Sequence, residues 1–211
     1  RLSSFSSETS AASVTVSYSI IKAFVTLSDL VLGGWTYGQA ANVPTVIITK
    51  DFADTVTASF EYLVNGAWVA AAPTAAGTYT VKAEVADTAN YTGAELTAEF
   101  TIAKAGVTIN GANESYTKVY DGNAFTLTGI TASNGATVTK VITKNGEAVD
   151  AIIGVGEYVI TYTVAESANY LEATRTVNVT VNKANVTISA PTIEGWTYSE
   201  AAKMPSAGFV E

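Results

Sequence analysis

Apolar and polar residues alternate along several stretches of this chain. In the stretch 78–85, every second residue is apolar or aromatic: Tyr79, Val81, Ala83 and Val85. The stretch 155–164 has the same alternation, with these residues on its apolar side: Tyr158, Ile160, Tyr162 and Val164. A period of two is typical of a β-strand that buries one face. No stretch of useful length has the 3.6-residue period of an amphipathic helix, so the pattern predicts an all-β protein.

Short turn signals separate the predicted strands. Asn65-Gly66 and Asn145-Gly146 each lie between two apolar runs. Asn-Gly is a strong hairpin signal, because both central residues of a type I′ turn have positive φ. Ahead of these hairpins, Phe24–Leu27 predicts a short opening strand. Regularly spaced turns, together with many Thr, Val, Ile and Tyr residues, predict small β-sandwiches.

The last strand of the predicted fold occurs more than once. Asn90–Ile109 matches Asn169–Ile188, and equivalent residues such as Lys104 and Lys183 are 79 positions apart. Residues 12–23 follow the same pattern when their Lys-Ala pair is superposed on the other two. A fixed period of this size indicates a tandem array of one structural unit.

The period divides the chain into four segments. We assign them as follows: 1–22, the last strand of a preceding repeat; 23–104, a first full repeat; 105–183, a second full repeat; 184–211, the opening part of a truncated third. Residues 1–22 lack a charged segment followed by an apolar run, so we expect no signal peptide there. The junctions contain no Gly/Ser-rich or Pro-rich linker, which predicts limited hinge motion and an extended array.

Composition and charge narrow the classes of function. Hydrophobic residues make up 48% of the chain, which is typical of folded domains. Eleven basic and nineteen acidic residues give a net charge of −8, and no Lys/Arg cluster is present. We therefore expect no nucleic-acid partner and no anionic membrane surface as a partner. No apolar run approaches the roughly 20 residues that a membrane helix needs, so we expect no membrane insertion.

The chain contains no Cys and no His. The lack of Cys excludes disulfides and thiolate metal sites, and is compatible with a bacterial exported protein. The lack of His removes the commonest general base and the commonest metal ligand. The remaining acidic candidates, Asp51, Asp54 and Glu61, flank a predicted turn, where solvated carboxylates are usual. We therefore expect no enzyme, no catalytic residue and no cofactor.

Two further candidate sites have simpler interpretations. Asp121-Gly122-Asn123 lacks the dense ligand spacing of a calcium loop, so we interpret it as a turn and expect no metal. Lys22, Lys104 and Lys183 recur at strand ends, where an isopeptide crosslink to an Asn would need a buried, apolar setting. A solvated lysine is the usual outcome at such a boundary, so we expect no crosslink.

Aromatic residues at the predicted turns are candidate ligand contacts. They are Trp35, Tyr37, Trp68, Trp196 and Tyr198. Such rings can stack on a pyranose ring of a glycan, or they can cap the end of a sandwich and pack inside it. We favour packing, because large aromatics dominate the cores of small domains. Exposure of the rings distinguishes the two hypotheses.

Several short motifs resemble a known family. They are Ala76-Gly-Thr-Tyr-Thr-Val81, Ala89-Asn-Tyr91, the strand ends with Lys-Ala, and Tyr120-Asp-Gly122. In order and spacing they resemble the MBG/YDG-type bacterial immunoglobulin-like repeats, although the first repeat has Tyr37-Gly38 in place of Tyr-Asp-Gly. The resemblance implies immunoglobulin-like β-sandwich modules in tandem along secreted or cell-surface bacterial proteins, often adhesins. It implies no catalytic residues.

Two functional hypotheses follow. In the first, the chain is a structural spacer or stalk of an extracellular or cell-surface bacterial protein, with neighbouring repeats as its partners. In the second, exposed Trp and Tyr residues bind a glycan or a host surface protein. Residues 185–211 contain opening strands without closing partners, so we also expect strand pairing between chains through this segment.

Overall fold

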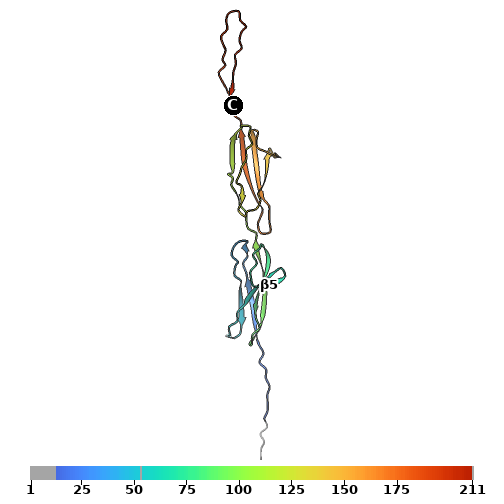
Figure 1. Cartoon of the computed structure of the whole chain (residues 1–211). Coiled ribbons are helices and arrows are strands. Elements are labelled where there is room, and N and C mark those ends of the chain that lie inside the picture. Colours follow the sequence, from blue (N-terminus) through green and yellow to red (C-terminus); the bar gives the residue numbers. More distant parts are fainter. Residues whose placement is uncertain (1–12, 53, 211) are drawn as a thin grey trace, which may run out of the picture. The chain divides into compact units, whose positions relative to one another are not determined.

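The computed structural model describes residues 13–52 and 54–210, and within them the regular secondary structure consists of strands (Figure 1). The strands are β1 (Ala23–Val31), β2 (Trp35–Thr36), β3 (Thr45–Lys50), β4 (Ser59–Val64), β5 (Ala67–Val69), β6 (Gly77–Val85), β7 (Tyr91–Thr92), β8 (Ala94–Ala103), β9 (Ile109–Asn110), β10 (Ser115–Val119), β11 (Thr131–Ala132), β12 (Thr139–Lys144), β13 (Glu147–Ala148), β14 (Gly156–Val164), β15 (Ala173–Asn182), β16 (Thr187–Ile188) and β17 (Phe209–Val210). Within these residues, no helix is long and apolar enough to cross a membrane.

The chain forms two compact units. Unit 1 contains the described residues up to Trp35 and residues 40–102, whereas unit 2 contains residues 36–39 and the described residues from Ala103 onward. Residues 36–39 therefore belong to unit 2, although Thr36 is also the last residue of β2, which pairs with β8.

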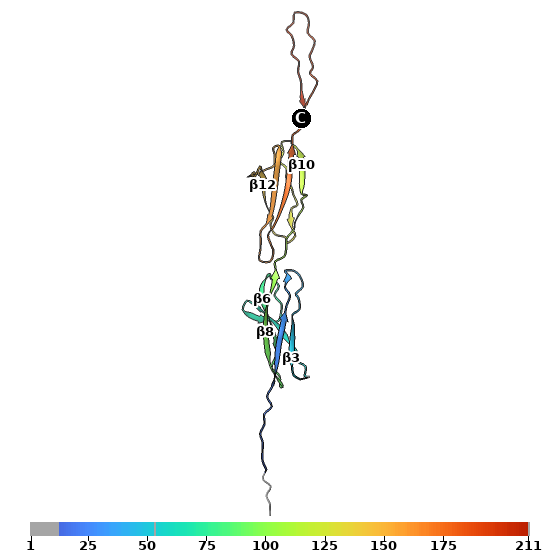
Figure 2. The same ribbon diagram turned by 180° about the vertical axis from the view of Figure 1, so that it is seen from behind.

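Unit 1 contains a five-stranded and a three-stranded sheet. The larger sheet has the order β2-β8-β6-β4-β5 and the smaller one the order β3-β1-β7 (Figure 2). Three of the four β6 residues that the alternation predicted to face inward are buried, namely Val81, Ala83 and Val85, and the fourth, Tyr79, is half-buried and stacks on Phe100. The opposite parity of β6 carries Thr80, Lys82 and Glu84, so one face of the strand lies in the core and the other carries polar groups.

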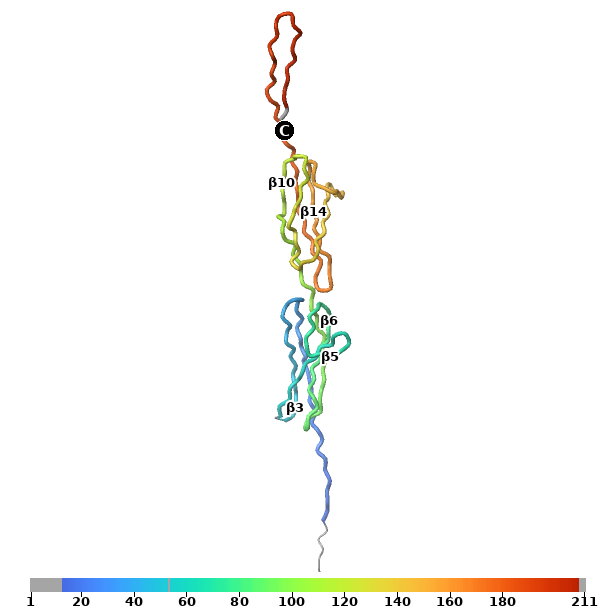
Figure 3. The backbone as a smooth tube through the Cα atoms, in the orientation of Figure 1, coloured from blue at the N-terminus to red at the C-terminus, as the bar shows by residue number. Residues whose placement is uncertain are grey.

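Unit 2 is built around the five-stranded sheet β10-β15-β14-β12-β13, with the short pair β11-β9 as its second sheet (Figure 3). One core cluster comprises Ile109, Ala132, Ile142, Ile152, Tyr158, Ile160, Tyr162, Val164, Val177, Val179 and Val181. The four residues of β14 that were predicted to face inward are all in this cluster. The expected class, all-β with an immunoglobulin-like sandwich, is confirmed.

The central strand pairs of the two units have the same register. β6 and β8 pair antiparallel from Gly77↔Ile102 to Val85↔Ala94. β14 and β15 pair antiparallel from Gly156↔Val181 to Val164↔Ala173, so every partner lies 79 positions further along. A register slip of one residue would turn the apolar side chains of a strand to the solvent face, so the shared alternation of apolar residues favours this one pairing.

The two Asn-Gly hairpin predictions are confirmed. Asn65 and Gly66 have φ values of 51° and 81° and join β4 to β5, whose residues Val64 and Ala67 are paired. Asn145 and Gly146 have φ values of 53° and 85° between β12 and β13. Positive φ at both central positions is the geometry that an Asn-Gly turn provides at low steric cost.

The opening strand is longer than the sequence predicted. β1 has nine residues, whereas the apolar pattern indicated only Phe24–Leu27. Its pairing with β3 shifts between Ser28 and Val31, and Asp29 lies within this shift with a φ of 51°. Because of this shift, the strand continues past a polar residue and buries Leu30. The period of two is interrupted there, so the strand predicted from that period was too short.

Candidate functional site

Trp35 is held against the core of unit 1. Its ring stacks on Phe100 of β8, with the ring centroids 5.1 Å apart and the planes at 21°. The preceding residue, Gly34, allows this approach, because a Cβ there would lie 2.3 Å from the backbone oxygen of Thr101. Packing, the interpretation favoured from the sequence, accounts for the position of this ring.

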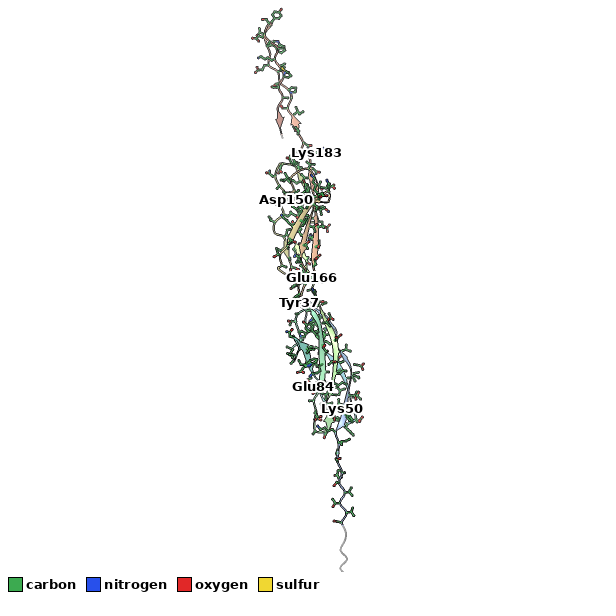
Figure 4. All side chains as sticks on the ribbon, turned by 90° about the vertical axis from the view of Figure 1, so that its right-hand side faces the viewer. Tyr37, Lys50, Glu84, Asp150, Glu166 and Lys183 are labelled. Carbon is green, nitrogen blue, oxygen red and sulfur yellow. The ribbon has the colours of Figure 1, made fainter. Side chains whose placement is uncertain are left out.

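Tyr37 has its own aromatic partner in unit 2. Its ring, labelled in Figure 4, meets Tyr170 edge-on, with the centroids 5.3 Å apart and the planes at 77°. Its backbone N–H donates to the carbonyl oxygen of Ala103 at 2.8 Å. Gly38 follows with a φ of 83°, which reverses the chain and directs the tyrosine to this contact.

Trp68 lies on β5 and is 39% exposed. The ammonium of Lys82 lies 5.1 Å from the centroid of its ring. Lys82 also forms ion pairs with Glu61 at 2.9 Å and with Glu84 at 2.8 Å. The hydrogen bonds to Glu84 and then Glu61 raise the pKa of Lys82 above its ordinary value of 10.5. An indole beside two carboxylates and an ammonium offers both a stacking surface and hydrogen-bonding groups to a polar ligand.

Trp196 and Tyr198 lie between β16 and β17. Trp196 is exposed, and Tyr198 is 98% exposed. Tyr198 is followed by Ser199 with a φ of 75°, the same left-handed turn that Gly38 makes after Tyr37. The five candidate aromatics therefore differ in setting: Trp35 and Tyr37 contact other rings, Trp68 is partly covered by Lys82, and these two rings face solvent.

Two of the three lysines at the strand ends bind carboxylates. Lys22 donates to Asp87, and Lys104 lies 2.7 Å from a carboxylate oxygen of Glu166, the residue labelled in Figure 4. The hydrogen bond from Lys22, followed by one from the backbone N–H of Gly93, lowers the pKa of Asp87 below its ordinary value of 3.8. The Lys22–Asp87 pair attaches the residues just before β1 to the loop before Asn90-Tyr91. The Lys104–Glu166 pair attaches the residues just after β8 to the loop before Asn169-Tyr170.

The acidic residues that were considered as catalytic candidates have separate partners. Asp54 accepts a hydrogen bond from the side-chain amide of Asn90 at 3.0 Å, whereas Glu61 is paired with Lys82. Asp51 is exposed. The absence of a catalytic activity stays a prediction.

Asp121 lies in a local turn. Its carboxylate is 2.7 Å from Lys118 and accepts the backbone N–H of Asn123 at 2.9 Å. These two groups, the lysine first, lower the pKa of Asp121 below 3.8. This is the Asx-type turn that Asp-Gly-Asn sequences favour. In the described ranges 13–52 and 54–210, no group of three Asp or Glu side chains is placed to hold a metal ion.

Arg175 is a structural residue at the position that Leu96 has 79 residues earlier, where the sequence predicts that the end of the inner face is open to water. Its guanidinium donates to the carbonyl oxygens of Ile109 at 2.8 Å and Ala112 at 2.5 Å. A groove of about 520 Å³ lies beside it, lined in part by Thr108 and Glu114. Arg175 stands out in the sequence because it lies on the side of β15 that otherwise carries the buried valines.

Part of the chain matches a known protein family. Residues 23–106 match the family model of the MBG domain. Among solved structures, the chain is similar to the fibronectin(III)-like modules of Clostridium thermocellum CbhA, with 15% identity, a TM-score of 0.25, and coverage of 75% of this chain and 94% of that one. No curated protein matches the chain significantly. The resemblance noted from the sequence motifs is thus confirmed over residues 23–106, which match the MBG domain.

Proposed function

We propose that this chain is a structural spacer, built from tandem immunoglobulin-like repeats, in a secreted or cell-surface bacterial protein of the adhesin type. The observation that carries the proposal is the register that β6–β8 and β14–β15 share, nine residue pairs at a spacing of 79. A register repeated at a fixed spacing is what duplication of one unit produces. The role is non-enzymatic, and the lack of His and Cys supports this.

The strand order of unit 2 suits a spacer under tension. β10, near the start of the unit, pairs in parallel with β15, its last long strand, over five residue pairs from Ser115↔Asn178 to Val119↔Asn182. Tension enters at the N-terminal end of β10 and leaves at the C-terminal end of β15. In a parallel pair these are opposite ends of the ladder, so the hydrogen bonds shear together and do not open one after another.

Unit 1 has a shorter pairing at the corresponding position. There β8 is bordered by the two-residue strand β2. When the whole chain is stretched through its termini by single-molecule force spectroscopy, we expect two major unfolding steps, with the step of unit 2 at the higher force. Unfolding of both units at the force that opens an isolated hairpin would contradict the spacer function.

A pair of variants at Tyr120 tests the mechanism directly. The backbone N–H of Tyr120 donates to the carbonyl oxygen of Asn182 at 2.9 Å, just beyond the β10–β15 ladder. Tyr120→Pro removes this donor, whereas Tyr120→Ala removes the ring and keeps the donor. We expect the proline variant to lower the unfolding force of unit 2 and the alanine variant to leave it close to that of the original chain.

A second candidate function is binding of a glycan or a host surface protein. The partial exposure of Trp68 beside Glu61 and Glu84 favours it, because an open indole can stack on a sugar ring while the carboxylates accept hydrogen bonds from the hydroxyl groups of the sugar. A glycan and mucin screen of the original chain, Trp68→Phe and Trp68→Ala tests it. Loss of a saturable signal by at least about tenfold in the alanine variant, with partial retention in the phenylalanine variant, would support binding. Equal signals in all three would exclude Trp68 as the contact.

A further inference from the structure

A polar groove lies beside the N-terminal half of β15. Its volume is about 520 Å³, and its lining includes Glu114 and residues 173–176. β10, the strand next to β15, pairs with it from Ser115↔Asn178 onward and therefore stops short of residues 173–177. The groove occupies the space that a longer β10 would fill. Its volume falls within the range of small-molecule sites, about 300–1,000 Å³.

Backbone groups of β15 point into this space. The N–H of Asn178 donates to the carbonyl oxygen of Glu114 at 3.0 Å, on the side of β10. Backbone N–H and C=O groups alternate in direction along a strand, so those of Thr174 and Thr176 point to the same side as those of Asn178. Both threonines line the groove. The main chain therefore offers hydrogen-bond donors and acceptors to a ligand.

Arg175 brings a positive charge to the same groove. Two of its five N–H donors bond to the carbonyl oxygens of Ile109 and Ala112, which fixes the position of the guanidinium. Among the described residues, no carboxylate forms an ion pair with it. The equivalent residue of unit 1 is the uncharged Leu96, so this position of the fold does not require a charge.

The mixture of groups indicates the chemistry of a ligand. A carboxylate can accept hydrogen bonds from the remaining N–H donors of Arg175, and guanidinium–carboxylate bonds are among the strong ones. The carboxylate of Glu114 and the carbonyl oxygens of Thr174 and Thr176 need donors, which sugar hydroxyl groups supply because a hydroxyl both donates and accepts. A phosphate or sulfate ion would be repelled by Glu114.

We propose that the groove beside Arg175 binds an acidic sugar, which is a uronic or sialic acid residue of a glycan. The carboxylate of the sugar binds Arg175, and its hydroxyl groups bind Glu114 and the backbone of Thr174 and Thr176. This site is separate from Trp68, which lies in unit 1. It is also independent of the spacer function, so loss of sugar binding would leave the unfolding forces of the two units unchanged.

Titration of the whole chain, followed by the NMR signals of its backbone amides, tests the proposal. The probes are D-glucuronic acid and N-acetylneuraminic acid. We expect saturable shifts of the Thr174 and Thr176 signals with at least one of them, weakened by added salt because the contact joins two charges. Glucose lacks the carboxylate, whereas acetate and a capped Gly-Glu-Gly peptide lack the sugar hydroxyl groups. Each of these three controls should bind at least about tenfold more weakly.

Three variants make the test specific. Arg175→Leu installs the residue type that unit 1 has at this position, so unit 2 should keep its fold while binding weakens at least about tenfold. Asn178→Asp adds a negative charge to the lining with almost no change in size, and should also weaken binding. Lys140→Leu removes a positive charge from an exposed position of β12, outside the groove, and should bind like the original chain.

Circular dichroism checks that all three variants retain their strands. The absence of a saturable shift with both acidic sugars would overturn the proposal. Unchanged binding in a folded Arg175→Leu variant would do the same, and Asn178→Asp provides this comparison if the leucine variant does not fold. Binding of acetate or of the peptide as tightly as the acidic sugars would refute the assignment to a sugar.

Discussion

Ile152→Ala should lower the free energy of unfolding of unit 2 by about 3 kcal/mol, whereas Ile153→Ala should lower it by less than about 0.5 kcal/mol. Ile152 is 1% exposed and belongs to the core cluster of the unit, and its carbonyl oxygen accepts the backbone N–H of Phe125 at 2.8 Å. Truncating its side chain removes buried apolar surface and leaves a cavity. Ile153 is 44% exposed, so the same truncation removes contacts mostly with water.

The two positions form a matched pair. They are adjacent and carry the same residue, so their effects on the unfolded chain are nearly equal and cancel in the comparison. Trp35 and Trp68 lie in unit 1, and Trp196 of unit 2 is exposed between β16 and β17, so no tryptophan reports on the core around Ile152, and unfolding in denaturant should be followed by circular dichroism and tyrosine fluorescence. Equal losses of stability in the two variants would show that Ile152 is not in the core.

Gly34→Ala should destabilise unit 1 by about 2–4 kcal/mol, and Gly33→Ala should change its stability by less than about 0.5 kcal/mol. A Cβ at Gly34 would lie 2.3 Å from the backbone oxygen of Thr101, so β2 or β8 must move. The neighbouring ring of Trp35 would then leave its stacked position on Phe100. At Gly33 the nearest atom is the side-chain nitrogen of Asn42, at an ordinary contact distance of 3.5 Å.

The stacked tryptophan provides the readout. In a background in which Trp68 and Trp196 are replaced by phenylalanine, fluorescence comes from Trp35 alone. We expect a red-shifted emission and an earlier denaturation midpoint for Gly34→Ala, and neither change for Gly33→Ala. An unshifted emission in Gly34→Ala would mean that the close approach of this glycine to β8 does not hold the ring in place.

Local patterns in the sequence predicted most of the strands. The alternation in β6 and β14 identified the buried residues, because a strand with one buried face repeats every two residues whatever its partner is. The Asn-Gly hairpins were predictable for a similar reason, since the requirement for positive φ acts on two adjacent residues. In both cases the information is contained in a few consecutive positions.

Partners that are distant in sequence could not be predicted this way. Lys104 and Glu166 are 62 positions apart, and no local pattern connects the two charges. The stacking of Trp35 on Phe100 depends on how β2 lies beside β8, which is a property of the folded sheet. The candidate aromatics could therefore be named from the sequence, but their separation into packed and exposed rings required the structure.

The arginine at the end of the β15 core face bears on how neighbouring domains of similar design avoid exchanging strands during folding. β8 and β15 have the same length and register, so each could compete for the other's place while both units are still open. Arg175 takes the position of Leu96, and its guanidinium donates to the carbonyl oxygens of Ile109 and Ala112. In unit 1 an arginine at the position of Leu96 would need other acceptors for these N–H groups, and a partly buried guanidinium without them carries a desolvation cost. The charge therefore disfavours β15 as the closing strand of unit 1.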